Sequence, residues 1–323
     1  MKTVVQITVL LAVLLFPGRS FSAVLFTEKF DDANLSSRGW YDNTTIKLST
    51  SEHTTGSVSS AEYHFAKGAT VPEISGGSIR KKFIESETVY IGYYVKHSTN
   101  WIGSGLPYQP HEIYVLTNMD GGACGDYCGL SVDHLTAYIE ENSGEPVLAI
   151  QDVLNIDQSK IGQDLTLTTE QRAVAGCNGY SRADGSDPED CYVAGSSYRN
   201  SKTWRTTTAF FQDSPGLYYK GDWHHVEVFF KLNSVVSGKG VADGVLQYWY
   251  DDVLIMNHGN VLYRTGQYPS MKFNQFVIAP YIGDGSPVDQ ALWIDDLVVA
   301  TSRPTISAPN GTIPSSPRNL RVQ

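Results

Sequence analysis

The chain has 323 residues, of which 41% are hydrophobic and 18% are charged, and it carries a net charge of −10. This is enough apolar material for a substantial core, which excludes a disordered chain and a miniprotein held together only by disulfides. The charged fraction lies below the globular average of roughly 25%, and 19 tyrosines accompany abundant Ser, Thr and Gly. This composition is typical of a β-rich protein. The net negative charge indicates that the surface as a whole repels nucleic acid.

The first 22 residues have the pattern of a secretory signal peptide. Lys2 precedes an apolar run over residues 4–16, and Ser20 and Ser22 supply small side chains at the −3 and −1 positions before Ala23. The run is shorter than the ~20 apolar residues that a membrane helix needs. We therefore expect a secreted, extracellular protein without membrane insertion. Removal of this segment would make the net charge two units more negative, because it carries two basic residues and no acidic one.

Short segments bounded by Gly, Asn, Asp or Ser recur along the chain and predict strands. The expected strands are residues 78–83, 88–96, 111–117, 135–140, 147–151, 207–211, 224–232, 246–250, 271–279 and 291–299. This many strands without an internal linker predict one all-β domain over residues 23–300, built as a sandwich or a barrel. Residues 301–323 contain four prolines and no apolar periodicity, and we interpret them as a tail or linker.

The four cysteines form two closely spaced pairs. Cys124 and Cys128 flank a Gly-Asp-Tyr loop, and Cys177 and Cys191 flank a loop rich in Gly and Asp. In an exported protein this arrangement favours two disulfides, and local pairing is the simplest of the three possible connectivities. A zinc site is a poor alternative, because neither pair has the Cys-x2-Cys spacing.

Alternate residues of a strand point to opposite faces of its sheet, so each predicted strand can be divided into a core face and a polar face. The polar face of 88–96 carries Tyr90, Tyr94 and Lys96, and that of 78–83 carries Arg80 and Lys82. Each such face is either a plain solvated surface or part of a glycan-binding face. Recurring tyrosines favour the second interpretation, because aromatic rings stack on the apolar faces of sugars.

The strand at 135–140, extended back by one residue, continues this pattern. Its polar face carries His134 and Tyr138, and Gln151 lies on the neighbouring strand. His111 begins a strand after a loop rich in Gly and Pro, where a substrate-facing residue is plausible, and Tyr114 follows on the same strand.

Four segments of the second half of the chain carry a resemblance to a known family. They are WHHVEVFFKLN at 223–233, ADGVLQYWYDD at 242–252, FVIAPYIG at 276–283 and WIDDLV at 293–298. They resemble concanavalin A-like (LamG-like) jelly rolls, and among these the polysaccharide lyases of the alginate and heparin lyase type. The pair Asp251-Asp252 departs from the family's Asp-Gly turn. The resemblance spans roughly residues 24–300 and implies a two-sheet antiparallel jelly-roll sandwich, with a polysaccharide handled on its concave face.

The chemistry of such a fold depends on particular side chains. A retaining glycosidase needs two carboxylates on one face, whereas the adjacent pairs Glu140-Glu141 and Asp295-Asp296 are expected to point to opposite faces. A lyase instead neutralises a uronate carboxylate, removes the neighbouring proton and protonates the leaving oxygen. The catalytic candidates are Arg80, His134, Tyr138 and Gln151, and the substrate-binding candidates are Lys82, Tyr90, Tyr94, Lys96, His111 and Tyr114.

Two alternatives to a lyase stay open. The absence of a complete catalytic string favours a non-catalytic lectin-like module, and an adhesion domain that contacts protein is the third interpretation. We expect no cofactor and no resident metal. The acidic loop with Asp184, Asp187 and Asp190 is a weak calcium candidate, because its spacing differs from that of an EF-hand. The expected partner is an extracellular polysaccharide, and no basic stripe indicates nucleic-acid binding.

Overall fold

The computed structural model describes residues 22–106, 110–117, 135–151, 190–194, 198–201, 203–264, 266 and 269–304. Of residue 151 and residues 190–203 it describes backbone alone. Residues 1–21 of the expected signal peptide, three of the four cysteines and the tail beyond residue 304 lie outside the described residues. So does the segment 158–174, in which the sequence could hold a short helix.

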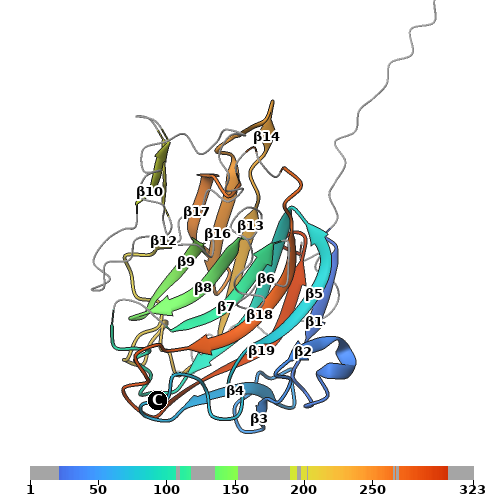
Figure 1. Ribbon diagram of the computed structural model, residues 1–323. Helices are drawn as coiled ribbons and strands as arrows, with labels where there is room; N and C mark the ends of the chain where they lie inside the picture. The colour runs from blue at the N-terminus through green and yellow to red at the C-terminus, as the bar shows by residue number, and fades with distance from the viewer. Residues whose placement is uncertain are drawn as a thin grey trace, which may run out of the picture.

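Most of the described chain forms two large sheets (Figure 1). The eight-stranded sheet contains β1 (Val24–Glu28), β3 (Lys47–Ser49), β4 (Ser60–Phe65), β6 (Thr88–His97), β13 (His224–Lys231), β16 (Gly244–Tyr250), β17 (Val253–Val261) and β19 (Gln290–Ala300). Its order is β17-β16-β13-β6-β19-β4-β3, with β1 also paired to β19.

The second sheet has seven strands, in the order β12-β9-β8-β7-β18-β5-β2. They are β2 (Trp40–Asp42), β5 (Ile79–Ser86), β7 (His111–Thr117), β8 (Thr136–Asn142), β9 (Glu145–Gln151), β12 (Thr203–Arg205) and β18 (Phe273–Tyr281). Every pairing within the two large sheets is antiparallel. The protein is thus an all-β jelly-roll sandwich, as expected.

The remaining elements are small. Two short hairpins pair β10 (Asp190–Ala194) with β11 (Tyr198–Ser201) and β14 (Val235–Val236) with β15 (Lys239–Gly240). The helical structure within the described ranges is the single 3₁₀ turn η1 (Ser36–Arg38). No helix in that part of the chain is long and apolar enough to cross a membrane.

The hydrophobic core lies between the sheets and confirms the alternation expected from the sequence. Val89, Ile91, Tyr93 and Val95 of β6 enter the core from one sheet, and Leu135, Ala137 and Ile139 at β8 enter it from the other. The polar residues between them therefore point outward. The alternation fails at β19, where Asp296 has a positive φ of 47° beside a register shift. The carboxylates of Asp295 and Asp296 therefore both lie within hydrogen-bond distance of the Thr54 hydroxyl, at 3.0 and 2.9 Å.

The expected strand at residues 207–211 is wrong. That segment is irregular, and the edge strand is instead β12, a few residues earlier. Phe210 and Phe211 explain the misleading apolar pattern, because both rings pack against Tyr250 of the core, with centroids 5.2 Å away in each case. Strands β4 and β17 were not expected, and β17 exposes most of its side chains.

The two ends of the described domain lie side by side. The backbone N–H of Thr301 donates to the carbonyl of Ala23 over 2.9 Å, and the Ser22 hydroxyl donates to the carbonyl of Ser302 over 2.7 Å. Together with the pairing of β1 and β19, these bonds join the start of the domain to its end.

Candidate functional site

The residues predicted to share one binding face fall on two opposite faces of the sandwich. β6 and β7 follow one another along the chain but belong to different sheets. Tyr90, Tyr94 and Lys96 of β6 alternate with core residues and lie on the outer face of the eight-stranded sheet, whereas Tyr114 of β7 lies on the outer face of the other sheet. Residues on these two faces therefore do not meet in one groove, because the core separates them.

On the outer face of the seven-stranded sheet, one row of register-paired residues crosses five strands. In the order of the strands, the row consists of Tyr138, Tyr114, Val277, Arg80 and Tyr41. Since neighbouring strands lie about 4.8 Å apart, Tyr114 and Arg80 are separated by roughly 10 Å with only Val277 between them. The row thus places phenols on one side of a small apolar side chain and a guanidinium on the other.

Four rings gather at the phenol end of this row. The ring centroids of Tyr114 and Tyr138 are 4.9 Å apart, and the His111 ring lies 5.2 Å from Tyr138 and 6.2 Å from Tyr114. Tyr281 pairs with His111 in the sheet, and their rings are nearly parallel with centroids 6.5 Å apart. Tyr281 is exposed, Tyr138 and His111 are half-buried and Tyr114 is buried, so the exposed fraction of the four side chains decreases from Tyr281 to Tyr114.

His111 is held by a carboxylate that the sequence reasoning did not place in the site. Nδ1 of His111 lies in hydrogen-bond contact with Oε1 of Glu140, which is buried on β8. Glu140 points outward beside Tyr138, while Glu141 points inward and accepts a hydrogen bond from the Trp101 indole. The expectation that these adjacent carboxylates face opposite ways is confirmed. The sequence signal for Glu140 was its position two residues after Tyr138, which puts both side chains on the same face of the strand.

Arg80 closes the other end of the row and is also tied to its neighbours. Its guanidinium Nε pairs with the carboxylate of Asp42 and donates to the Ser78 hydroxyl over 3.1 Å. The same Ser78 hydroxyl donates to Asp42 over 3.0 Å. Arg80 is buried and Asp42 is exposed, so the outermost group at this position is the carboxylate.

Lys82 and Tyr41 lie beside this end of the row. The Lys82 ammonium is 5.5 Å from the centroid of the Tyr41 ring, and the buried amide of Gln275 donates to the Tyr41 hydroxyl. Neither Tyr41 nor Gln275 was a candidate from the sequence. Tyr41 lies on β2, which is only three residues long and shows no alternation that could be recognised.

On the outer face of the eight-stranded sheet, charged side chains pair with one another. A pocket of about 200 Å³ there is lined in part by Tyr90, His225, Glu227, Asp252 and Arg303. Arg303 donates to Glu227 over 2.7 and 2.5 Å, and the Tyr90 hydroxyl donates to the same carboxylate over 2.7 Å. His225, Glu227 and Asp252 bring possible metal-ligand atoms within 4.8 Å of one another, but Arg303 already supplies a cation to both carboxylates.

The other two candidates on this sheet also have local partners. The Tyr94 ring stacks on His225 with centroids 4.7 Å apart, and Lys96 pairs with Glu52 over 2.6 Å. Burial raises the pKa of Tyr94, with the nearby carboxylates adding to the effect. These contacts give Tyr94 and Lys96 structural roles on the face opposite the aromatic row.

Several predicted site residues lie outside what the structure describes. His134, Cys124, Cys128, Cys177, Asp184 and Asp187 are outside the described residues, and for Gln151, Asp190 and Cys191 only the backbone is described. Gln151 pairs in register with Thr136 at the end of β9. The disulfide and calcium expectations therefore stay predictions.

On the seven-stranded face, the arrangement contains the groups that proton transfer and carboxylate recognition require. The imidazole of His111, oriented by Glu140, can take or give a proton, and the phenols of Tyr114 and Tyr138 can donate one. Arg80 offers a cation with planar donor geometry. The Tyr281 ring exposes an apolar surface on which a sugar can stack.

Comparison with known proteins identifies the fold. No family model and no curated protein sequence matches the chain. Among solved structures, the PL-14 alginate lyase from Aplysia kurodai is similar with a TM-score of 0.53 and 14% identity, over 86% of this chain and 99% of that one. Alginate lyase vAL-1 from Chlorella virus is similar with a TM-score of 0.50 and 14% identity, over 86% of this chain and 100% of that one. The chain therefore has the jelly-roll sandwich fold that these polysaccharide lyases share.

Proposed function

We propose that the protein is a secreted polysaccharide lyase that binds an acidic extracellular glycan on the outer face of the seven-stranded sheet. The observation that carries this proposal is the row Tyr138–Tyr114–Val277–Arg80, which joins phenols and a guanidinium across a small side chain, with the His111–Glu140 pair beside it. The likeness to alginate lyases supports the fold on which such a face is built. The predicted signal peptide supports an extracellular substrate.

The proposed reaction is β-elimination. A uronate residue lies over Val277, with its carboxylate toward Arg80 and its ring against the tyrosines. His111, oriented by Glu140, removes the proton from the carbon next to the carboxylate. The electron pair forms a carbon–carbon double bond as the glycosidic carbon–oxygen bond breaks, and the phenol of Tyr138 gives its proton to the leaving oxygen. Arg80 stabilises the negative charge that develops on the carboxylate in the transition state.

The test is incubation with alginate, glucuronan and heparin-type chains, followed by the ultraviolet absorbance of the conjugated double bond in the product. A rise with one of these acidic glycans supports the proposal. A neutral β-glucan serves as the control, since it has no carboxylate to activate the proton. Retained binding of an acidic glycan with no absorbance change on any of the three would overturn the lyase.

A second function, glycan binding without cleavage, is favoured by one observation. Arg80 is buried and already paired with Asp42, so its charge is partly neutralised before any substrate arrives. A lectin-like module needs only the stacking surface of Tyr281 and Tyr138, with hydrogen bonds from His111. Affinity chromatography on immobilised alginate distinguishes the two, because a lectin retains the glycan unchanged while a lyase shortens it.

A further inference from the structure

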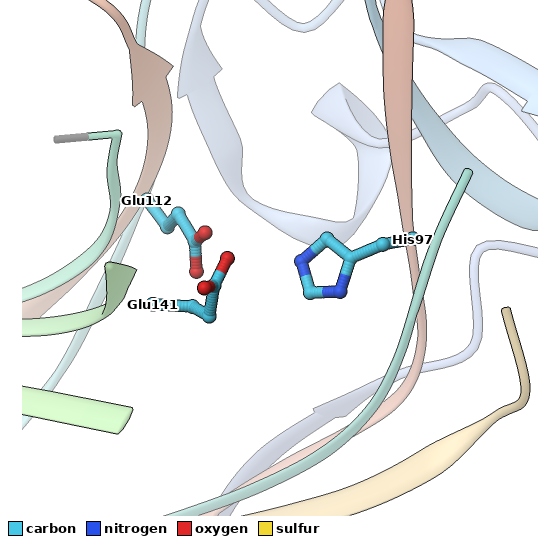
Figure 2. A group of neighbouring side chains, drawn as sticks. All are labelled: His97, Glu112 and Glu141. Atoms are coloured by element: carbon cyan, nitrogen blue, oxygen red, sulfur yellow. The ribbon is translucent and has the colours of Figure 1, made fainter. Parts of the chain in front are cut away.

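Three titratable side chains meet between the two sheets, away from the aromatic row. They are His97 at the end of β6, Glu112 on β7 and Glu141 on β8, and Figure 2 shows the two carboxylates turned toward the imidazole. All three are buried, with exposures of 1%, 5% and 4%. One possible ligand atom from each lies within 4.8 Å of the others.

Two of these side chains aim polar atoms into the cluster without a hydrogen-bond partner. Among the residues that the structure describes, neither ring nitrogen of His97 has one, and neither does Oε1 of Glu112. The His97 ring is instead packed between aromatic rings, with centroids 4.8 Å from Trp101 and 4.9 Å from Phe211. Burying polar atoms without partners costs free energy, so natural proteins rarely leave several together. The cluster thus brings together buried polar atoms that have no hydrogen-bond partner among the described residues.

Glu141 is oriented in the manner of a metal ligand. The Trp101 indole donates to one of its oxygens over 2.9 Å, and the backbone N–H of Gly144 donates to the other. Gly144 has a φ of +82°, and a Cβ there would lie 2.7 Å from the carbonyl of Phe211, so only glycine suits the turn that provides this N–H. Hydrogen bonds of this kind commonly fix the direction of a ligating carboxylate.

The charge at this cluster is not balanced by an ion pair with a described side chain. The ammonium of Lys220 lies nearby, but it donates to the Trp101 carbonyl and to Asp213, not to Glu112 or Glu141. This contrasts with His225, Glu227 and Asp252 on the outer face, where Arg303 supplies the cation. Two buried carboxylates need either protons or a positive charge between them.

We propose that His97, Glu112 and Glu141 bind one divalent cation, with zinc the best fit. A divalent ion neutralises two carboxylates, and one imidazole with two carboxylates is a donor set that zinc accepts, whereas calcium prefers oxygen alone. A neutral imidazole keeps a lone pair with which it can bind the ion. Tetrahedral zinc places ligand atoms about 3.4 Å apart, so atoms that now lie up to 4.8 Å apart must close by up to about 1.4 Å.

The bound ion would act as a clamp between the sheets. His97 belongs to the eight-stranded sheet, and Glu112 and Glu141 belong to the seven-stranded sheet. Along the chain, Glu112 follows His111 and Glu141 follows Glu140, so the clamp fixes the backbone that carries the outward-facing His111–Glu140 pair. The metal site itself does not depend on the proposed lyase activity.

The experiment uses the full-length secreted protein, stripped with a chelator and dialysed against zinc chloride as the probe. We expect about one equivalent of zinc by elemental analysis and a Tm that rises with free zinc, because the ion binds only the folded state. Absence of saturable zinc binding together with an unchanged Tm overturns the proposal.

Two variants locate the ion. Glu112→Gln keeps the size of the side chain and is expected to abolish the zinc-dependent rise in Tm, whereas the control Glu227→Gln in the outer-face cluster retains it. Trp101→Phe removes the hydrogen bond to Glu141 and should weaken zinc binding by about 10–100-fold. A zinc effect that persists in Glu112→Gln places the ion elsewhere and overturns the assignment.

X-ray absorption of the zinc-loaded wild type keeps the proposal testable even if Glu112→Gln fails to fold. One imidazole and carboxylate oxygens at about 2.0–2.2 Å are expected. Sulfur ligands at about 2.3 Å would instead show that cysteines hold the metal, and an all-oxygen shell would exclude His97.

Discussion

Tyr114 and Tyr138 face each other across β7 and β8, with ring centroids 4.9 Å apart and ring planes inclined by 65°. Tyr114 is buried, and Tyr138 packs against it from the outer side of the sheet. The edge-to-face contact fixes the Tyr138 ring, because such pairs are worth about 0.5–1.5 kcal/mol beyond the area they bury. In the proposed reaction the two phenols therefore have separate roles, with Tyr114 supporting the ring of Tyr138 and Tyr138 giving the proton.

Tyr138→Phe is expected to retain glycan binding and to lose turnover. The substitution keeps the ring and its contact with Tyr114 but removes the proton donor, and general acid catalysis contributes typically about 10²–10⁴-fold. The ultraviolet assay and glycan retention are measured on the same preparation. Tyr94→Phe is the matched control, because Tyr94 stacks on His225 on the opposite face and should leave both readouts unchanged.

Glu140→Gln tests whether the carboxylate positions His111. The amide keeps the shape of the side chain but no longer stabilises an imidazolium, so turnover should fall while KM changes little. His111→Asn should lower turnover at least as much, and the double variant should cost no more than His111→Asn alone. Additive losses would show that the two residues do not act as a pair.

Asp42→Asn is expected to strengthen the binding of acidic glycans. Removing the Asp42 charge removes one carboxylate that competes with a uronate for the Arg80 guanidinium, and a gain of about fivefold in affinity corresponds to about 1 kcal/mol. The loss of a half-exposed ion pair should lower the free energy of unfolding by about 0.2–1 kcal/mol. Calorimetric titration at two salt concentrations checks the sign, and weaker binding in the variant would contradict a role for Arg80 in recognition.

Arg303→Gln should destabilise the protein at neutral pH and less so in acid. Burial by itself raises the pKa of Glu227, but the hydrogen bonds from Arg303 and Tyr90 outweigh it, and the net pKa lies below the ordinary value of 4.5. The stabilisation by this carboxylate is therefore fully present above about pH 4.5 and is lost as the pH falls through the lowered pKa.

For Arg303→Gln, the free energy of unfolding at pH 7 should fall by about 1–3 kcal/mol, because a buried carboxylate loses its charged donors. Since protonation of Glu227 removes the need for a cation, the difference from wild type should shrink toward pH 4. Urea unfolding at a series of pH values measures this, with Arg303→Lys as the charge-conserving control. A difference that grows in acid would contradict the role of the pair.

The strands that could be predicted from sequence are those whose alternation is set by the core. The strand expected at residues 111–117 coincides with β7, and the inward side chains of β6 and β8 are those expected. β17 could not be recognised, because its exposed residues carry no alternation and it is held by pairing with β16. Phe210 and Phe211 instead led to the prediction of a strand where the chain is irregular, since irregular chain can also pack aromatic rings on a core.

The residues of the candidate site were harder to predict from the sequence than the fold. Alternation shows that Tyr94 and Tyr138 point outward, but it does not show from which sheet, because sheet membership depends on pairing between distant strands. Glu140 was missed as a site residue for the same reason, as its partner His111 is remote in sequence. The inward turn of Glu112, one residue after His111, accompanies a register irregularity that no sequence pattern indicated.

The adjacency of Ala23 and Thr301 has a practical consequence for handling the molecule. Arg303 and Pro304 line the pocket on the outer face of the eight-stranded sheet, so the last described residues lie on the side opposite the aromatic row. Immobilising the protein through residues that follow Pro304 should therefore leave the Tyr138 face open to a long polymer. The same proximity favours circular permutation, because a short linker can join the two ends without disturbing either sheet.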